Sequence, residues 1–193
     1  MPSPRPPIET YYAGAYWGPR KESPEECARR AVTFLNLLAS CAPLLASWNK
    51  IPKPRGRGRK TPLMPPDFTA LTEAFRRGVN REPGGPAIEH LGLRVSAYND
   101  GTRDDFVSLS MLCGSYATGR TSNACVLNPP SRGPNAERIL SAPVLTAVVH
   151  SMAIDWEPDW AVAISHAHRD VLEADAKDDV WTGWVTRSPS TTC

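Results

Sequence analysis

The chain has 193 residues, 41% of them hydrophobic and 22% charged, with a formal net charge of +2. This size and composition allow one well-buried core, so we expect a single domain. The chain has no run of eighteen apolar residues, and its first seven residues lack the apolar region of a signal peptide, which favours a soluble, cytoplasmic protein without a membrane span. No C-x-x-C pair occurs, so we expect reduced thiols at Cys27, Cys41, Cys113, Cys125 and Cys193.

The N-terminal part predicts a buried strand followed by an amphipathic helix. Residues 8–17 carry aromatic side chains on both faces of an alternating strand, which places this strand inside a sheet. The segment Ser23-Pro-Glu-Glu26 combines an N-cap serine, a first-turn proline and a glutamate at N3, which together form a capping box. Apolar residues at helical spacing then run from Cys27 to Cys41, and Pro43 should end the helix.

Residues 50–66 change character, with five prolines and six basic residues, and predict a loop. Its centre, Lys53 to Lys60, is similar to the AT-hook, in which arginines enter the narrow minor groove of DNA. Arg55, Arg57 and Arg59 therefore define one alternative function, a DNA-binding module. Glycine and arginine stand where the hook would have its proline, and there is one copy, so a solvated basic loop is the competing interpretation.

The remaining elements are grouped rather than strictly alternating. Asp67 should cap a helix over residues 68–77, and Ser141-Ala-Pro143 should open another with a buried stripe that ends at Met152. Asn99-Asp-Gly101 is turn chemistry between two strands of a predicted antiparallel meander. The strands expected after residue 90 are 91–97, 107–113, 124–127, 161–164 and 180–186.

This grouping predicts an α+β fold. We expect one domain over residues 9–187, with a mostly antiparallel β-sheet and helices packed on one face. Residues 1–8 should be a disordered N-terminus and residues 188–193 a frayed C-terminus.

The segment from Asp155 to Asp170 is the candidate functional region. Asp155 to Trp160 alternates acids with tryptophans around Pro158, which is typical of a surface loop, and a buried strand follows. Tryptophan is enriched in interface hot spots, so two tryptophans among three carboxylates indicate a recognition surface. The competing interpretation is that these tryptophans belong to the core, and we expect one of the pair to be buried.

A metal-dependent hydrolase is a second alternative function. His166, His168 and Asp170 would share one face if the preceding strand continued, and could then chelate a metal. No other ligand cluster completes this site, and a histidine at a strand end is more often a structural residue. Ser165 lacks the G-x-S-x-G motif of a nucleophile elbow. We therefore predict no catalytic residue, no metal and no cofactor.

Several motifs, taken in order, resemble the bacterial immunity protein 52 family. The resemblance runs from about Thr10 to Thr186 and is carried most clearly by spaced tryptophans. Its motifs are Tyr11–Gly18, Lys21–Arg30 with the leucine-rich helix, Pro43–Trp48, Ser122–Leu127, Ala142–Leu145, Trp156-x-Pro-Asp-Trp160, Ser165-His166 and Gly183-Trp184. The chain departs from the family pattern after Trp184, where family members continue beyond the Gly-Trp strand.

The resemblance implies an immunity protein and not an enzyme. Such proteins are encoded beside polymorphic or type VI secreted toxins, commonly restriction-endonuclease-like nucleases, and bind the cognate toxin to neutralise it. A nuclease presents a basic surface to DNA, so an inhibitor can compete by presenting carboxylates and aromatic side chains. The candidate partner-binding residues are Asp155, Trp156, Glu157, Asp159, Trp160 and Asp170. They can cover the active site, another face of the toxin or its assembly surface.

Overall fold

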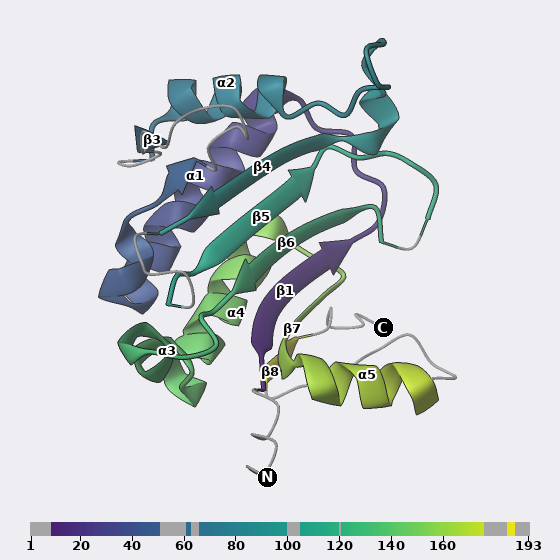
Figure 1. Cartoon of the computed structure of the whole chain (residues 1–193). Helices are drawn as coiled ribbons and strands as arrows, with labels where there is room; N and C mark the ends of the chain where they lie inside the picture. Colours follow the sequence, from purple (N-terminus) through teal and green to yellow (C-terminus); the bar gives the residue numbers. More distant parts are fainter. Residues whose placement is uncertain are drawn as a thin grey trace, which may run out of the picture.

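The computed structural model describes residues 9–50, 61–62, 66–99, 105–119, 121–175 and 185–187. Within these residues the fold is α+β, with an antiparallel sheet of eight strands in the order β3-β2-β4-β5-β6-β1-β7-β8 (Figure 1). The strands are β1 (Tyr11–Trp17), β2 (Asn49–Lys50), β3 (Thr61–Pro62), β4 (Leu93–Tyr98), β5 (Ser108–Cys113), β6 (Asn123–Asn128), β7 (Trp160–Ser165) and β8 (Val185–Arg187). The helices are α1 (Pro24–Cys41), α2 (Phe68–Arg77), α3 (Pro134–Ile139), α4 (Ala142–Trp156) and α5 (His166–Asp175), with 3-10 turns η1 (Pro43–Ala46) and η2 (Glu89–Leu91).

The sheet follows the periodicities of the sequence. β1 lies between β6 and β7, as the aromatic residues on both of its faces predict. β4, β5 and β6 form the expected antiparallel meander, in which Val95 faces Met111 and Met111 faces Cys125. These inward residues are buried, while their neighbours along each strand are partly exposed, because successive side chains of a strand point to opposite faces.

Three helices cover one face of the sheet. α1, α2 and α4 lie behind the strands in Figure 1, and α1 contacts both α2 and α4. Ser23 starts α1 with the predicted capping box: its Oγ accepts from the N–H of Glu26, whose carboxylate accepts from the N–H of Ser23. Asp67 caps α2 in the same way, by accepting the N–H of Ala70 at 2.6 Å.

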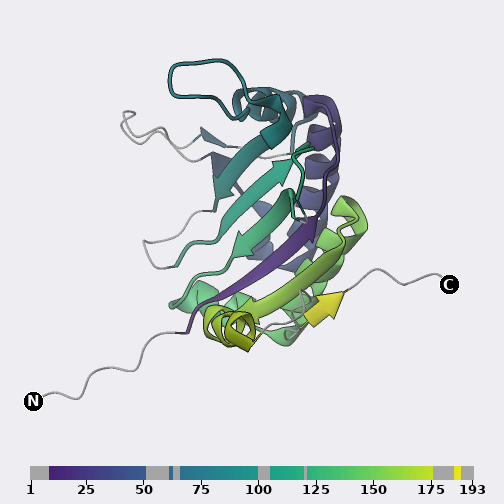
Figure 2. The same ribbon diagram turned by 90° about the vertical axis from the view of Figure 1, so that its right-hand side faces the viewer.

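The short helix α5 lies on the opposite face of the sheet from α1 (Figure 2). β1 and β7 also carry apolar side chains on that face, and Tyr12, Val162 and Ile164 form a second small cluster against which Leu172 of α5 packs. The sequence predicted helices on one face of the sheet only. α5 lies on the other face because β1 and β7 carry apolar side chains there, and the helix buries them from water.

Several sequence predictions fall outside the described residues. They concern residues 1–8, the basic segment Lys53 to Lys60, the turn residues Asp100 and Gly101, Trp181 with Trp184, and residues 188–193. Among the described cysteines, Cys27, Cys113 and Cys125 are buried free thiols and Cys41 is a partly buried one, as expected. In the described part of the chain, no helix combines the length and the apolar character that a bilayer span needs.

Candidate functional site

Three segments meet where β1 ends, α1 begins and α4 ends. Residues 17–20 leave β1, residues 22–30 lead into the first turns of α1, and residues 155–159 close α4. α4 ends because Glu157 takes a left-handed backbone conformation with φ 46°, which helical residues do not adopt. The last carbonyl groups of α4 then need donors from outside the helix.

Two arginines supply these donors and join the three segments. Arg30 donates to the carbonyl of Asp155, to the Glu22 carboxylate at 2.9 Å and to the Glu157 carboxylate at 2.9 Å. Arg20 donates to the carbonyl of Trp156 at 2.8 Å and lies 3.3 Å from Glu22 Oε1. Since Arg30 and Glu157 are 127 positions apart, this network fixes the end of α4 against the start of α1.

Asp155 is a buried carboxylate within this network. It is 8% exposed, and its Oδ2 has no hydrogen-bond partner among the described residues. Burial raises the pKa of Asp155 to about 7, with Arg30 and Arg20 opposing the rise and Glu157 and Glu22 adding to it. Together with Glu22, Glu26, Arg29, Arg30 and Thr33, it lines a cavity of about 340 Å³. The predicted surface position of Asp155 is therefore wrong.

Trp156 is a core residue rather than a surface residue. It is 0% exposed, stacks on Trp17 with ring centroids 5.5 Å apart, and meets the edge of Phe34 at 5.8 Å. The prediction that Asp155 to Trp160 forms one surface loop is wrong at its start, because α4 continues through Trp156. The prediction that one tryptophan of the pair is buried is confirmed.

Glu157, Asp159 and Trp160 reach the surface beside this network. The Glu157 side chain is 67% exposed although it pairs with Arg30. Asp159 is exposed and accepts the N–H of Gly18 at 2.8 Å. Trp160 is partly buried and stacks on Tyr16 at 4.2 Å, on the sheet face opposite to the main helices. These three candidates remain grouped at one end of β7.

Asp170 lies apart from the other candidates. It is exposed on α5, where Arg169 Nη2 donates to its carboxylate at 2.6 Å. α5 follows the C-terminal end of β7, whereas the other candidates precede or begin that strand. The structure therefore does not bring all six predicted residues into one patch.

The metal interpretation loses its geometric basis. His166 begins α5, so the strand on which His166, His168 and Asp170 would alternate ends at Ser165. His168 instead donates its N–H to Ser165 Oγ at 3.1 Å, and the His166 ring lies 5.0 Å from that of Tyr12. Within the described ranges, no three His, Cys, Asp or Glu side chains are grouped so that they could hold a metal.

Sequence reasoning missed the residues that organise this end of the molecule. Arg20, Glu22 and Arg30 were assigned no role, although they hold the candidate segment in place. A usable signal was the density of charged residues between Arg20 and Arg30, in front of and within the first turns of a strongly marked helix. The positions that they contact, more than 120 residues later, carry no such signal.

The buried carboxylate makes stability depend on pH, and this can be measured. The ordinary pKa of Asp155 is 3.8. Between pH 4 and 7 the folded protein keeps a proton that the unfolded chain has released, so the contribution of Asp155 to stability is present at low pH and is lost as pH rises. Between pH 5 and pH 8, the free energy of unfolding should fall by about 2 kcal/mol more in the unaltered protein than in Asp155→Asn. One pKa unit corresponds to about 1.4 kcal/mol, and water in the cavity reduces the effect.

Urea unfolding of both proteins at pH 5 and at pH 8 checks this prediction. Other titrating groups are common to the two proteins, so the difference between their pH dependences isolates Asp155. Parallel stability profiles would show that Asp155 titrates at its ordinary pKa.

The sequence model of the family described as Immunity protein 52 matches residues 9–190, which is nearly the full length of 193 residues. No curated protein matches the chain. The match covers β1, the arginine network and the candidate segment together. The chain therefore belongs to the immunity protein 52 family.

Proposed function

We propose that this protein binds and neutralises a cognate secreted bacterial toxin, a nuclease of the restriction-endonuclease-like class. The observation that carries the proposal is the family match over residues 9–190, because an immunity protein of this family implies a cognate toxin partner. The proposed toxin is a polymorphic toxin of the kind delivered by type VI secretion. The protein acts in the cytoplasm, without catalysis of its own, by covering the toxin's active site or DNA-binding surface.

The exposed carboxylates near the end of α4 support a basic partner. Glu157 and Asp159 are exposed there, and Glu26 is exposed on the first turn of α1. A nuclease surface that binds DNA is basic, so it would be attracted to these groups, and association would slow as salt rises. Trp160 adds an aromatic side chain of the kind enriched in hot spots. In this proposal Asp155 and Trp156 hold the segment in place from beneath.

Co-expression with the product of the adjacent gene tests the function. We expect the two proteins to purify as one complex, and we expect plasmid cleavage by the toxin to stop when this protein is present. If the two proteins do not form a complex and plasmid cleavage is unchanged, the proposal is overturned for that pair. Binding to a toxin that cuts no nucleic acid would keep the immunity role and remove the nuclease.

Charge reversal then tests the surface. Glu157→Lys should slow association about tenfold at low salt and less at high salt, because it changes electrostatic steering. Glu137→Lys is the matched control, since Glu137 is also exposed but lies on α3. Equal association rates for the two variants would exclude the end of α4 from the interface.

A further inference from the structure

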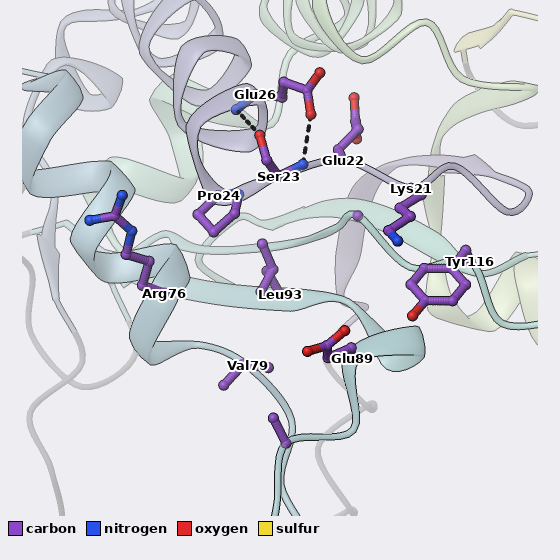
Figure 3. Close-up of a pocket in the computed structure, with 12 residues that line it drawn as sticks. Lys21, Glu22, Ser23, Pro24, Glu26, Arg76, Val79, Glu89, Leu93 and Tyr116 are labelled. Atoms are coloured by element: carbon purple, nitrogen blue, oxygen red, sulfur yellow. Dashed lines mark hydrogen bonds between the residues drawn. The ribbon is translucent and has the colours of Figure 1, made fainter.

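A pocket lies beside the start of α1, next to the proposed surface. It has a volume of about 580 Å³, within the range of about 300–1,000 Å³ that ligand pockets occupy. Figure 3 shows that its walls come from the segment before α1, the end of α2, β4 and the loop after β5. Apolar surface predominates, and it is contributed by Pro24, Val79, Ala87, Leu93 and Tyr116.

The pocket is held open by backbone constraints. Gly114 has φ +73°, and a Cβ at this position would lie 2.6 Å from the carbonyl oxygen of Glu22. The two backbones therefore approach closely at Gly114, and the N–H of Arg20 donates to the carbonyl of Ser115 at 2.8 Å, which joins the loop after β5 to the segment before α1. The carbonyl of His90 accepts the N–H groups of Tyr116 and Ala117, which fixes the same loop against η2. A preformed pocket costs a ligand little ordering entropy.

The charged side chains that line the pocket are two cations, Lys21 and Arg76, and three carboxylates, Glu22, Glu26 and Glu89. Lys21 lies over the Tyr116 ring at 5.1 Å, Arg76 pairs with Glu25, and the Glu26 carboxylate accepts from Ser23. Glu89, in contrast, makes no hydrogen bond or ion pair through its carboxylate with any residue that the structure describes. Figure 3 places this carboxylate beside the hollow between Val79 and Tyr116. With three carboxylates and two cations, the pocket lining carries a net negative charge, and Glu89 is its carboxylate without a partner among the described residues.

The rim of the pocket resembles an interface. Tyr116, which lines the pocket, is 37% exposed. Tyrosine is one of the residue types that carry most binding energy in interfaces. Glu22 and Glu26 line both this pocket and the 340 Å³ cavity with Asp155, so the pocket continues the surface that begins at Glu157.

From these features we infer that the pocket receives an arginine or lysine side chain of the toxin together with an adjacent apolar residue. The cationic group pairs with Glu89, and the apolar residue packs on Leu93, Val79 and the Tyr116 ring. The inference rests on the proposed function, since the occupant belongs to the toxin, and it names the surface through which that function is carried out.

Two pocket variants and two matched controls test the inference in the toxin complex. Tyr116→Ala should weaken binding by about 30-fold, which is the effect of a hot spot, and Glu89→Arg by about tenfold, mainly through slower association. Phe106→Ala is the control for Tyr116, because Phe106 is 38% exposed but precedes β5 rather than following it. Glu137→Arg is the control for Glu89, because α3 follows the other end of the β4–β6 meander. Both controls should bind like the unaltered protein.

The outcomes separate the inference from the function on which it rests. If the unaltered protein binds the toxin and the pocket variants bind as tightly as their controls, the pocket is not the receptor site and the immunity function stands. If the unaltered protein binds no toxin, both proposals fail. Circular dichroism of each variant shows whether it is folded. If Tyr116→Ala is unfolded, toxin binding by Glu89→Arg alone tests the inference. The Glu89 side chain is exposed and has no partner to lose among the described residues.

Discussion

Replacing Trp156 with alanine is expected to lower the free energy of unfolding by about 3–5 kcal/mol, the usual cost of removing a large aromatic side chain from a core. Its side chain is fully buried and contacts both Trp17 and Phe34, so the substitution leaves a cavity between β1, α1 and α4. Those surroundings cannot collapse easily, because Arg20 and Arg30 hold the end of α4 in position. Urea unfolding monitored by circular dichroism measures the loss.

Trp160→Ala is the matched control for this prediction. Trp160 is partly exposed and stacks on Tyr16, so its removal should cost about 1–2 kcal/mol, less than the removal of a fully buried tryptophan. In the proposed complex, however, Trp160→Ala should weaken toxin binding, whereas Trp156 offers no surface to a partner. Equal losses of stability for the two variants would contradict the assignment of Trp156 to the core and Trp160 to the surface.

The contrast between these tryptophans shows where sequence reasoning stops. Both stand in one acidic segment, and Pro158 made the whole segment look like a loop. A signal for the true boundary was present, because Trp156 follows Met152 by four residues and continues the buried stripe of the helix. Composition favoured a loop and periodicity favoured a helix, and the buried contacts of Trp156 decided for the helix.

Local signals predicted most of the fold. The capping box at Ser23, the cap at Asp67 and the period-two strands of the meander depend on neighbouring residues, and each was found as expected. The strand expected over residues 161–164 is found as β7, but it does not continue past Ser165, as the metal alternative required, and α5 follows instead. Ser165 Oγ accepts the N–H of His168, which satisfies a donor in the first turn of a helix, and Leu172 can then reach the outer apolar cluster.

The candidate site could be predicted in part for a different reason. The acidic residues Glu157 and Asp159 were chosen by composition, but the groups that position them lie far away in sequence. The pocket beside them joins residues 21–26, 76–93 and 114–116, and no motif in one of these segments refers to the others. Such surfaces arise from strand order and helix placement, so they become visible when the tertiary structure is known.

Asn123→Ala is expected to lower the free energy of unfolding by about 3 kcal/mol, because this buried side chain joins two loops of the site. Its Oδ1 accepts the N–H of Ser115 at 2.8 Å, and its Nδ2 donates to the carbonyl groups of Gly18 and Ser115 at 2.7 and 3.0 Å. Asn123 is 0% exposed, so water cannot readily replace these bonds. Leaving buried polar groups unpaired costs about 1–3 kcal/mol each, and Ser115 N–H and Gly18 C=O lose the partner that Asn123 provides.

Asn128→Ala on the same strand is the matched control. Asn128 is partly exposed and donates to Ser108 Oγ at 3.3 Å, so its loss should cost less than about 1 kcal/mol. The two variants remove the same atoms from opposite ends of β6, and a difference between them therefore reports the hydrogen bonds of Asn123 rather than strand propensity. Since Asn123 holds the loops that carry Arg20 and Tyr116, its substitution should also weaken toxin binding, which a role confined to the core would leave unchanged.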